Sequence, residues 1–145
     1  MPIVADILRA KGDAVHSIDP SATVLDATHK MNQHKLGALV VMSQGRVAGM
    51  FTERDVLRRV VGEVRDPAKT RVSEVMTTEV ICVRPDTDMD EVSAIMQQRR
   101  IRHVPVCDAD GELHGMISIG DVNAYHVSTQ EMQISFLNEY IYGRA

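Results

Sequence analysis

Apolar positions in the first half of the chain follow two different patterns in succession. The run Val15–Ile18, closed by Asp19-Pro20, is typical of a short strand. Val24, Ala27 and Met31 then recur at spacings of three and four residues, which places them on one face of a helix. The pattern predicts a strand followed by a helix.

Two further strands and a second helix complete this half. Residues 36–42 form an almost continuous apolar run, which is typical of a strand covered on both faces. A turn at Gly45 leads to the apolar residues 47–51, and an amphipathic segment follows Asp55. The predicted order is strand, helix, strand, strand, helix.

The second half of the chain repeats this order. Pro85 follows Pro20 by 65 residues, and the apolar positions after each proline match at the same distance. One extra residue in the turn 108–111 moves the match to 66 residues, so Gly115 corresponds to Gly49. Agreement over so many positions predicts an internal duplication. We expect the second-copy elements at residues 80–83, 89–96, 104–107 and 113–117.

Both predicted first helices carry a capping signal. Thr23 with Asp26 three residues later has the pattern of a capping box, and Asp88 with Glu91 repeats it. We therefore expect both side chains to cap the helices that follow them.

The duplication divides the chain into four parts. Residues 6–8 match residues 74–76 at the start of each copy, and a polar stretch around Pro67 separates the copies. The parts are a first repeat (1–62), a linker (63–70), a second repeat (71–127) and a C-terminal helical tail (128–145).

The tail has no counterpart in the first copy and carries an apolar stripe. Its members are Phe136, Leu137, Tyr140 and Ile141. The repeats offer this stripe no partner, so we expect it to bury against a second chain and form a homodimer.

Composition excludes several classes of protein. The 145 residues are 44% hydrophobic, which suffices for a core, and the net charge of −4 argues against a nucleic-acid binder. No apolar run approaches the ~20 residues of a membrane span, and the N-terminus lacks a secretory signal pattern. Cys82 and Cys107 are expected to be buried free thiols in a reducing cytoplasm. The basic run 99–102 fits the C-terminal end of a helix.

A seven-residue motif occurs once in each copy. Gly49–Asp55 and Gly115–Asp121 both read Gly, two apolar residues, a hydroxyl residue, two variable residues and Asp. Thr52 or Ser118 can cap a helix there, and an acid in the first turn suits the helix dipole. Capping explains one copy alone; two copies in matching contexts favour a ligand role for both aspartates.

The paired repeats, with their two motifs and the strands 37–41 and 102–106, resemble a tandem pair of CBS domains, also called a Bateman module. The resemblance covers residues 4–127. It implies a mixed α/β (α+β) fold: two β-α-β-β-α repeats packed about a pseudo-two-fold axis, followed here by a C-terminal helix. Proteins of this family bind adenosine-containing ligands in clefts between the repeats and generally regulate rather than catalyse.

The resemblance also implies roles for individual residues. Asp55 and Asp121 would accept hydrogen bonds from ribose hydroxyls. The residues that would contact ribose or phosphate are Thr52, Ser118, Arg54, Arg102, His103 and Lys11. Those that would line the adenine slot are Ser17, Ile18, Ala38, Cys82, Val83 and Pro105. The ligand would be AMP, ADP or ATP, or else NAD or S-adenosylmethionine; no metal or other cofactor is implied.

The two clefts differ in sequence. Gly37-Ala38 in the first copy stands where the second has Arg102-His103, and Gly120 replaces Arg54. We therefore predict one tight site and one weak or empty site. For His103 a phosphate contact and a purely structural hydrogen bond stay equally open.

Two functions remain open at this point. The first is nucleotide-dependent regulation of a protein partner that the sequence does not name. The second is a dimerising interaction module without nucleotide binding. Enzyme interpretations lack a motif: no nucleophile elbow, GxxxxGK[ST] loop, CxxC or HExxH occurs in the chain.

Overall fold

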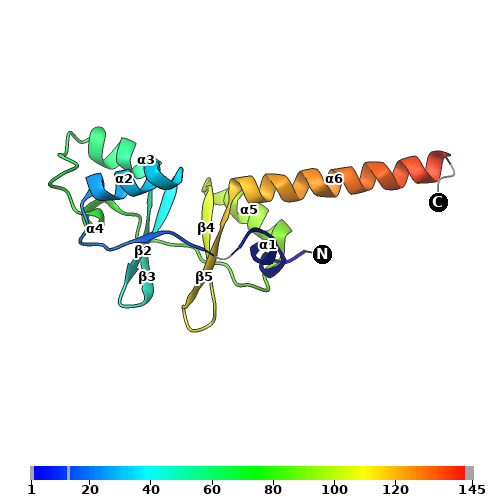
Figure 1. The fold of residues 1–145 in the computed structure, drawn as a ribbon, viewed down its shortest axis with the longest axis horizontal. Coiled ribbons are helices and arrows are strands. Elements are labelled where there is room, and N and C mark those ends of the chain that lie inside the picture. Colours follow the sequence, from blue (N-terminus) through cyan, green and yellow to red (C-terminus); the bar gives the residue numbers. More distant parts are fainter. Residues whose placement is uncertain (1, 13, 143–145) are drawn as a thin grey trace.

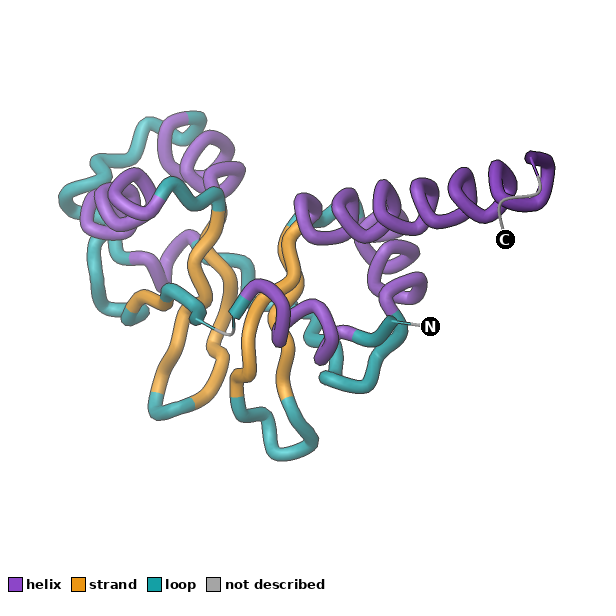
Figure 2. The backbone as a smooth tube through the Cα atoms, turned by 45° about the vertical axis from the view of Figure 1, so that its right-hand side comes forward, coloured by secondary structure: helices purple, strands orange, loops and turns teal. Residues whose placement is uncertain are grey.

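The computed structural model describes residues 2–12 and 14–142, and it contains two similar halves that face each other (Figures 1 and 2). The first half contains β1 (Ser17–Ile18), α2 (Val24–His34), β2 (Ala38–Ser43), β3 (Arg46–Thr52), α3 (Glu53–Asp55) and the π-helical η1 (Val56–Val61). The second contains α5 (Met89–Arg99), β4 (His103–Cys107), β5 (Leu113–Ser118) and α6 (Ile119–Tyr142). A short helix precedes each half: α1 (Val4–Lys11) and α4 (Val72–Val75).

The two sheets have the same plan. In the first, β1 pairs in parallel with β2, and β2 pairs antiparallel with β3. In the second, β4 and β5 are antiparallel, and residues 80–83 contribute a single parallel bridge from Val83 to Val106 in place of the predicted strand. Both hairpins shift register at the matching positions Val41/Met42 and Val106/Cys107.

The helix caps are only partly as predicted. Thr23 caps α2, because its hydroxyl oxygen accepts a hydrogen bond from the Asp26 backbone N–H at 3.1 Å. The expected cap at Asp88 is wrong: this residue occupies the N-cap position of α5, but its side chain makes no capping hydrogen bond. One carboxylate oxygen, Oδ1, is buried and has no partner among the described residues.

Each short leading helix packs into the core of the half that it does not precede. Val4 and Leu8 of α1 belong to the core of the second repeat, with Met89 and Ile117. Val72 and Val75 of α4 belong to the core of the first repeat. A third apolar cluster joins the two sheets; its members include Ala38, Val40, Met50, Leu113 and Met116. The halves therefore share one interlocked core, with their sheets facing each other and their longer helices outside (Figure 1).

Two motif glycines make this exchange possible. A Cβ atom on Gly49 would lie 2.7 Å from the Thr77 carbonyl oxygen and 2.8 Å from the Met76 sulphur. A Cβ atom on Gly115 would lie 2.7 Å from the Leu8 Cδ2 atom. Each glycine thus marks the point where the leading segment of the other repeat crosses the sheet.

Helix α6 extends well beyond the second repeat (Figure 1). Its 24 residues correspond to about 36 Å at ~1.5 Å per residue. Apolar side chains exposed along it are Val127, Met132, Ile134 and Leu137. The side chains of Phe136, Tyr140 and Ile141 from the predicted stripe lie outside the described part. Over residues 2–12 and 14–142, no helix combines the length and apolar character needed to cross a membrane.

The two cysteines lie side by side, although only one is buried. Cys107 is buried, whereas Cys82 is exposed, which corrects the expectation that both would be inside. The Cys107 thiol faces the Cys82 sulphur at 3.2 Å. Burial, together with this neighbour, raises the pKa of Cys107 to about 12.

We predict that Gly49→Ala lowers the free energy of unfolding by about 1–3 kcal/mol, the usual cost of overpacking a core. The colliding atoms include the Thr77 carbonyl oxygen, which can move only if the backbone moves. Gly115→Ala should cost less, because the flexible Leu8 side chain can yield. Urea unfolding of both variants measures the difference.

Gly120→Ala is the matched control. Its new Cβ would lie 3.5 Å from the nearest atom, the Ser118 hydroxyl oxygen, and alanine favours helix over glycine. It should be neutral or stabilising. Equal unfolding midpoints for Gly49→Ala and Gly120→Ala would contradict the close approach.

Candidate functional site

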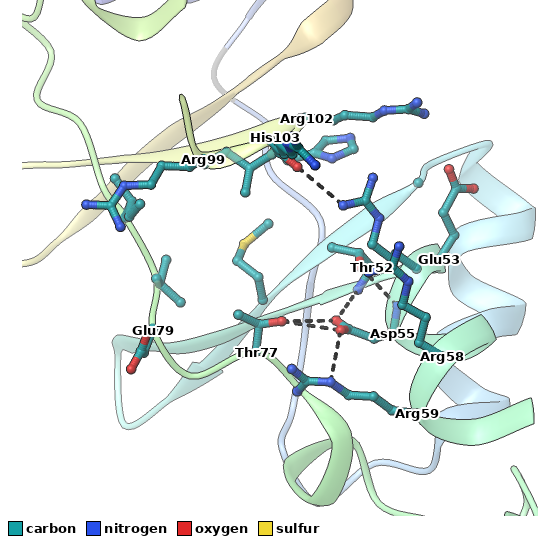
Figure 3. A pocket seen from close by; sticks show the side chains of 17 residues that line it. Thr52, Glu53, Asp55, Arg58, Arg59, Thr77, Glu79, Arg99, Arg102 and His103 are labelled. Carbon is teal, nitrogen blue, oxygen red and sulfur yellow. Dashed lines mark hydrogen bonds and ion pairs between the residues drawn. The ribbon is translucent and has the colours of Figure 1, made fainter. Parts of the chain in front are cut away.

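A pocket of about 280 Å³ lies between the two repeats on the side of the first motif (Figure 3). This volume is near the lower end of the range, ~300–1,000 Å³, that is typical of small-molecule sites. One wall comes from Gly37, β3 and residues 52–59, and the opposite walls come from residues 77–81 and 99–103. Any occupant would therefore contact both repeats.

Asp55 is fixed at the base of this pocket by the turn from β3 into α3. Its backbone N–H donates to the Thr52 hydroxyl oxygen at 3.2 Å, and its carboxylate oxygen Oδ2 accepts from the Thr52 backbone N–H at 3.0 Å. This reciprocal capping confirms the predicted helix start. The residue is only 6% exposed, so it is far more buried than an ordinary first-turn acid.

Two side chains from other segments also face the Asp55 carboxylate (Figure 3). The Thr77 hydroxyl donates to Oδ1 at 3.2 Å, and the Arg59 Nε atom lies 3.8 Å from the same oxygen. Thr77 is held there by a pair of backbone hydrogen bonds with Met50, both 2.9 Å. A carboxylate offers about four acceptor positions. Thr52 and Thr77 occupy two of these among the described residues, so capacity remains for ligand donors.

Arginines dominate the charge of the pocket walls. The six in the lining are Arg54, Arg58, Arg59, Arg99, Arg100 and Arg102, and the three acids are Glu53, Asp55 and Glu79. The Arg54 Nη1 atom donates to the Arg100 carbonyl oxygen at 3.3 Å and so joins the two walls. The pocket is locally positive in a chain of net charge −4, which suits an anionic ligand.

His103 stands beside Gly37 at the edge of the pocket. A Cβ atom on Gly37 would lie 3.5 Å from the His103 ring carbon Cε1 and 3.4 Å from the Glu53 carboxylate. Burial is the main cause that lowers the pKa of His103. The positive charges of Arg102 and Lys11 act in the same direction, whereas Glu53 and Asp121 oppose them.

The second motif lies outside the lining of this pocket, and its Ser118 and Asp121 cap the start of α6. The Asp121 carboxylate oxygen Oδ2 accepts from the Ser118 backbone N–H at 2.8 Å and from its hydroxyl at 3.0 Å. The Lys11 ammonium donates to the same oxygen at 2.7 Å. Burial opposes ionisation of Asp121, but these donors hold its pKa below the usual value.

The structure brings together only part of the predicted site. Thr52, Arg54, Asp55, Arg102 and His103 line the pocket, while Lys11, Ser118 and Asp121 meet at the start of α6. The predicted adenine-slot residues lie outside that lining. Among them, Ala38 and Val83 pack in apolar clusters, and Ile18 packs against the core of the first repeat. Cys82 and Val83 border a second hollow near the β4–β5 turn. Ser17 pairs with Val40 in the sheet, and Pro105 is buried in β4.

The pocket lining also contains residues that the sequence did not indicate. They include Thr77, Val80, Ile81, Arg58, Arg59 and Arg99. Val80 and Ile81 precede the predicted pair Cys82-Val83 by two residues and supply apolar surface. Val80 and Ile81 lie in a loop instead of the predicted strand, and Cys82 after them lies outside the pocket lining.

Outside the pocket, the β4–β5 turn gathers Asp108, Glu112 and His114, whose possible metal-ligand atoms all lie within 4.8 Å of one another. His114 Nε2 lies 2.8 Å from Asp108 Oδ2, and the backbone N–H groups of Asp110 and Glu112 donate to Asp108 Oδ1. These contacts lower the pKa of Asp108, the His114 hydrogen bond most of all. They explain the cluster as support for a tight turn, and we assign it no ligand.

Comparison with known proteins identifies the repeats. A family model described as the CBS domain matches residues 4–62 and 72–127. The mitochondrial CBS domain-containing protein CBSX3 of Arabidopsis thaliana is 37% identical over 149 residues, which cover 97% of this chain and 72% of that protein. The CBS domain-containing protein YhcV of Bacillus subtilis is 34% identical over 124 residues, covering 86% of this chain and 87% of that one.

Solved structures agree with this result. A protein with CBS domains from Burkholderia ambifaria MC40-6 has a TM-score of 0.85 and is 40% identical. The match covers 89% of this chain and 96% of that one. The similarity therefore extends over both repeats and the interface between them.

We predict that acid destabilises the fold through His103. Its folded pKa lies below the ordinary value of 6.5, so the unfolded chain takes up this proton first as pH falls. The stability that comes from the neutral ring is present above about pH 6.5 and is lost as pH falls through the lower folded pKa. Urea unfolding between pH 7.5 and 5 should therefore show a steeper loss for the natural chain than for His103→Gln. Parallel curves would contradict the assignment.

Proposed function

Because the chain belongs to the CBS domain family, as a tandem pair of these domains, we propose that it is a regulatory module that binds an adenine nucleotide in the Asp55 pocket. The ligand class is AMP, ADP or ATP; NAD and S-adenosylmethionine share the adenosine group and belong in the same screen. No cofactor is required and no reaction is assigned. A cytoplasmic location stays a prediction from the sequence.

The observation that carries this proposal is the buried Asp55 carboxylate beside the pocket arginines. A nucleotide needs an acceptor for its sugar hydroxyls and cations for its phosphates, and the pocket supplies both within one volume. The apolar side chains of Val80, Ile81 and Ile101 offer surface for a base. Arg54 and Arg102 come from different repeats, so phosphates held between them would bridge the halves.

Regulation would follow from that bridge. A ligand that contacts both repeats favours the relative placement in which both walls reach it, and a protein partner that contacts both repeats would respond to the change. The coupling can be no larger than the difference in ligand affinity between the two placements. The identity of that partner is not part of the proposal.

A second candidate function is a dimerising interaction module that binds no nucleotide, and α6 is the observation that favours it. Val127, Ile134 and Leu137 recur at spacings of seven and three residues and are all more than half exposed. We propose that this face packs against α6 of a second chain in a homodimer. Light scattering with and without residues 128–145 tests the assembly, and nucleotide titration separates the two functions.

We predict that Asp55→Asn weakens ATP binding by about ten-fold or more. The amide keeps the shape and can still accept from Thr52, but it loses the negative charge; hydrogen bonds to charged groups are worth ~1.5–3 kcal/mol, and ~1.4 kcal/mol is one decade of affinity. Asp121→Asn is the matched variant and should bind as the natural chain does, because Asp121 lies outside the lining of this pocket. Isothermal titration calorimetry gives both affinities.

Circular dichroism spectra and unfolding midpoints that match those of the natural chain show that each of these variants is folded. Unchanged ATP affinity in folded Asp55→Asn would refute the site. Loss of affinity in Asp121→Asn alone would move the site to the second motif.

The pocket arginines should act on phosphates rather than on adenosine. We predict that Arg54→Ala and Arg102→Ala each reduce ATP affinity by about ten-fold or more, and adenosine affinity much less, because guanidinium groups hold phosphate oxygens. Arg65→Ala, an exposed position between the repeats, should leave both affinities unchanged. Equal losses for ATP and adenosine would show that neither pocket arginine meets phosphate.

A further inference from the structure

The two cysteines of the chain meet at a second hollow, which has a volume of about 420 Å³. Both line this hollow, and its lining shares no described residue with that of the Asp55 pocket. Cys82 is exposed to solvent, whereas Cys107 is only 6% exposed. The Cys107 thiol faces the Cys82 sulphur at 3.2 Å, so the hollow gives solvent access to one member of a thiol pair.

Backbone hydrogen bonds hold the two cysteines in this position. Val83 and Val106, the inner neighbours of the pair, form a parallel bridge. The Val83 N–H donates to the Pro105 carbonyl oxygen at 3.0 Å, and the Cys107 N–H donates to the Val83 carbonyl oxygen at 2.9 Å. A disulfide bond is ~2.0 Å long, so the two sulphur atoms need to approach by roughly 1.2 Å, a displacement on the scale of side-chain rotation.

The two thiols differ in reactivity. Burial is the main cause that raises the pKa of Cys107 to about 12, and the neighbouring Cys82 and Asp108 act in the same direction. Cys107 is therefore protonated near neutral pH, and the nucleophile in thiol chemistry is the thiolate. Cys82 is the thiol that a reagent in solution reaches. This asymmetry makes Cys82 the first sulphur to react and Cys107 the second.

We propose that Cys82 and Cys107 are a peroxide-reactive site that closes to a reversible disulfide. The Cys82 thiolate attacks one oxygen of the peroxide and breaks the O–O bond, which leaves a sulfenic acid on Cys82. The released hydroxide takes up the proton that Cys82 lost and becomes water. The Cys107 sulphur then bonds to the Cys82 sulphur, and the sulfenic hydroxyl leaves with the Cys107 proton as a second water. Two thiols are oxidised by two electrons, and one hydrogen peroxide is reduced to two water molecules.

The bond would join two segments that also build the Asp55 pocket. Cys82 directly follows Ile81 of the pocket wall, and Cys107 ends β4, which begins at the pocket residue His103. In the reduced chain, the single bridge at Val83 is the only strand pairing that residues 80–83 make in the described structure. Oxidation would add a covalent link beside that bridge.

Titration of the full chain with hydrogen peroxide tests this proposal, because the chain has only two cysteines. Both thiols should disappear from a thiol assay in denaturant, and the mass of the single chain should fall by two hydrogen atoms. Dithiothreitol should restore both thiols and the original mass. Glutathione in the same tube serves as a reference thiol for the peroxide exposure.

Two variants separate the roles of the sulphur atoms. Cys107→Ala removes the second thiol without burying a hydroxyl, so its Cys82 should stop at the sulfenic acid and be captured by dimedone, which should label the natural chain far less. Cys82→Ser keeps the buried thiol alone, and that thiol should stay free.

Three results would overturn the proposal. The first is that both thiols of the natural chain persist while glutathione is oxidised. The second is that Cys82 passes to higher oxides while Cys107 stays free. The third is that the disulfide joins two chains instead of the two cysteines of one chain.

Discussion

The whole arrangement depends on the crossing of each leading segment over the sheet of the other repeat. Met76-Thr77 crosses at Gly49, where the Thr77 carbonyl oxygen leaves no room for a Cβ atom, and Leu8 crosses at Gly115, where a Cβ atom would force the Leu8 side chain to move. Because of this exchange, neither repeat has a complete core of its own. The same exchange puts Thr77 against Asp55, so the constraint that holds the fold together also builds the pocket.

The duplicated motif stands in two different sets of contacts. In both copies, a hydroxyl residue and an aspartate cap a helix in the same reciprocal way. Thr77 of one crossing segment and Arg59 of η1 face Asp55, whereas Lys11 of the other crossing segment faces Asp121. A duplicated motif alone therefore does not give the two aspartates equal surroundings.

The sequence predicted those features that depend on local spacing. The caps at Thr23, Thr52 and Ser118 and the repeated strand pairs need only neighbours along the chain, and the structure has them. The prediction failed where a contact crosses between repeats, because nothing local to Thr77 shows that it faces Asp55. The Asp88 cap also failed: its Oδ1 atom is buried without a partner among the described residues, and the first N–H of α5, on Met89, donates to the Pro2 carbonyl oxygen at 3.1 Å. The adenine-slot role predicted for Cys82 and Val83 assumed a strand over residues 80–83. The structure has a single bridge there, from Val83 to Val106.

A crystal structure of the chain grown with ATP would show directly whether the Asp55 pocket holds the nucleotide. We expect one nucleotide per chain between the repeats, with its ribose hydroxyls on the Asp55 carboxylate and its phosphates among the arginines from residues 54–59 and 99–102. In the same crystal, Lys11 should remain on Asp121. A nucleotide bound elsewhere, or one whose ribose does not contact Asp55, would contradict the account.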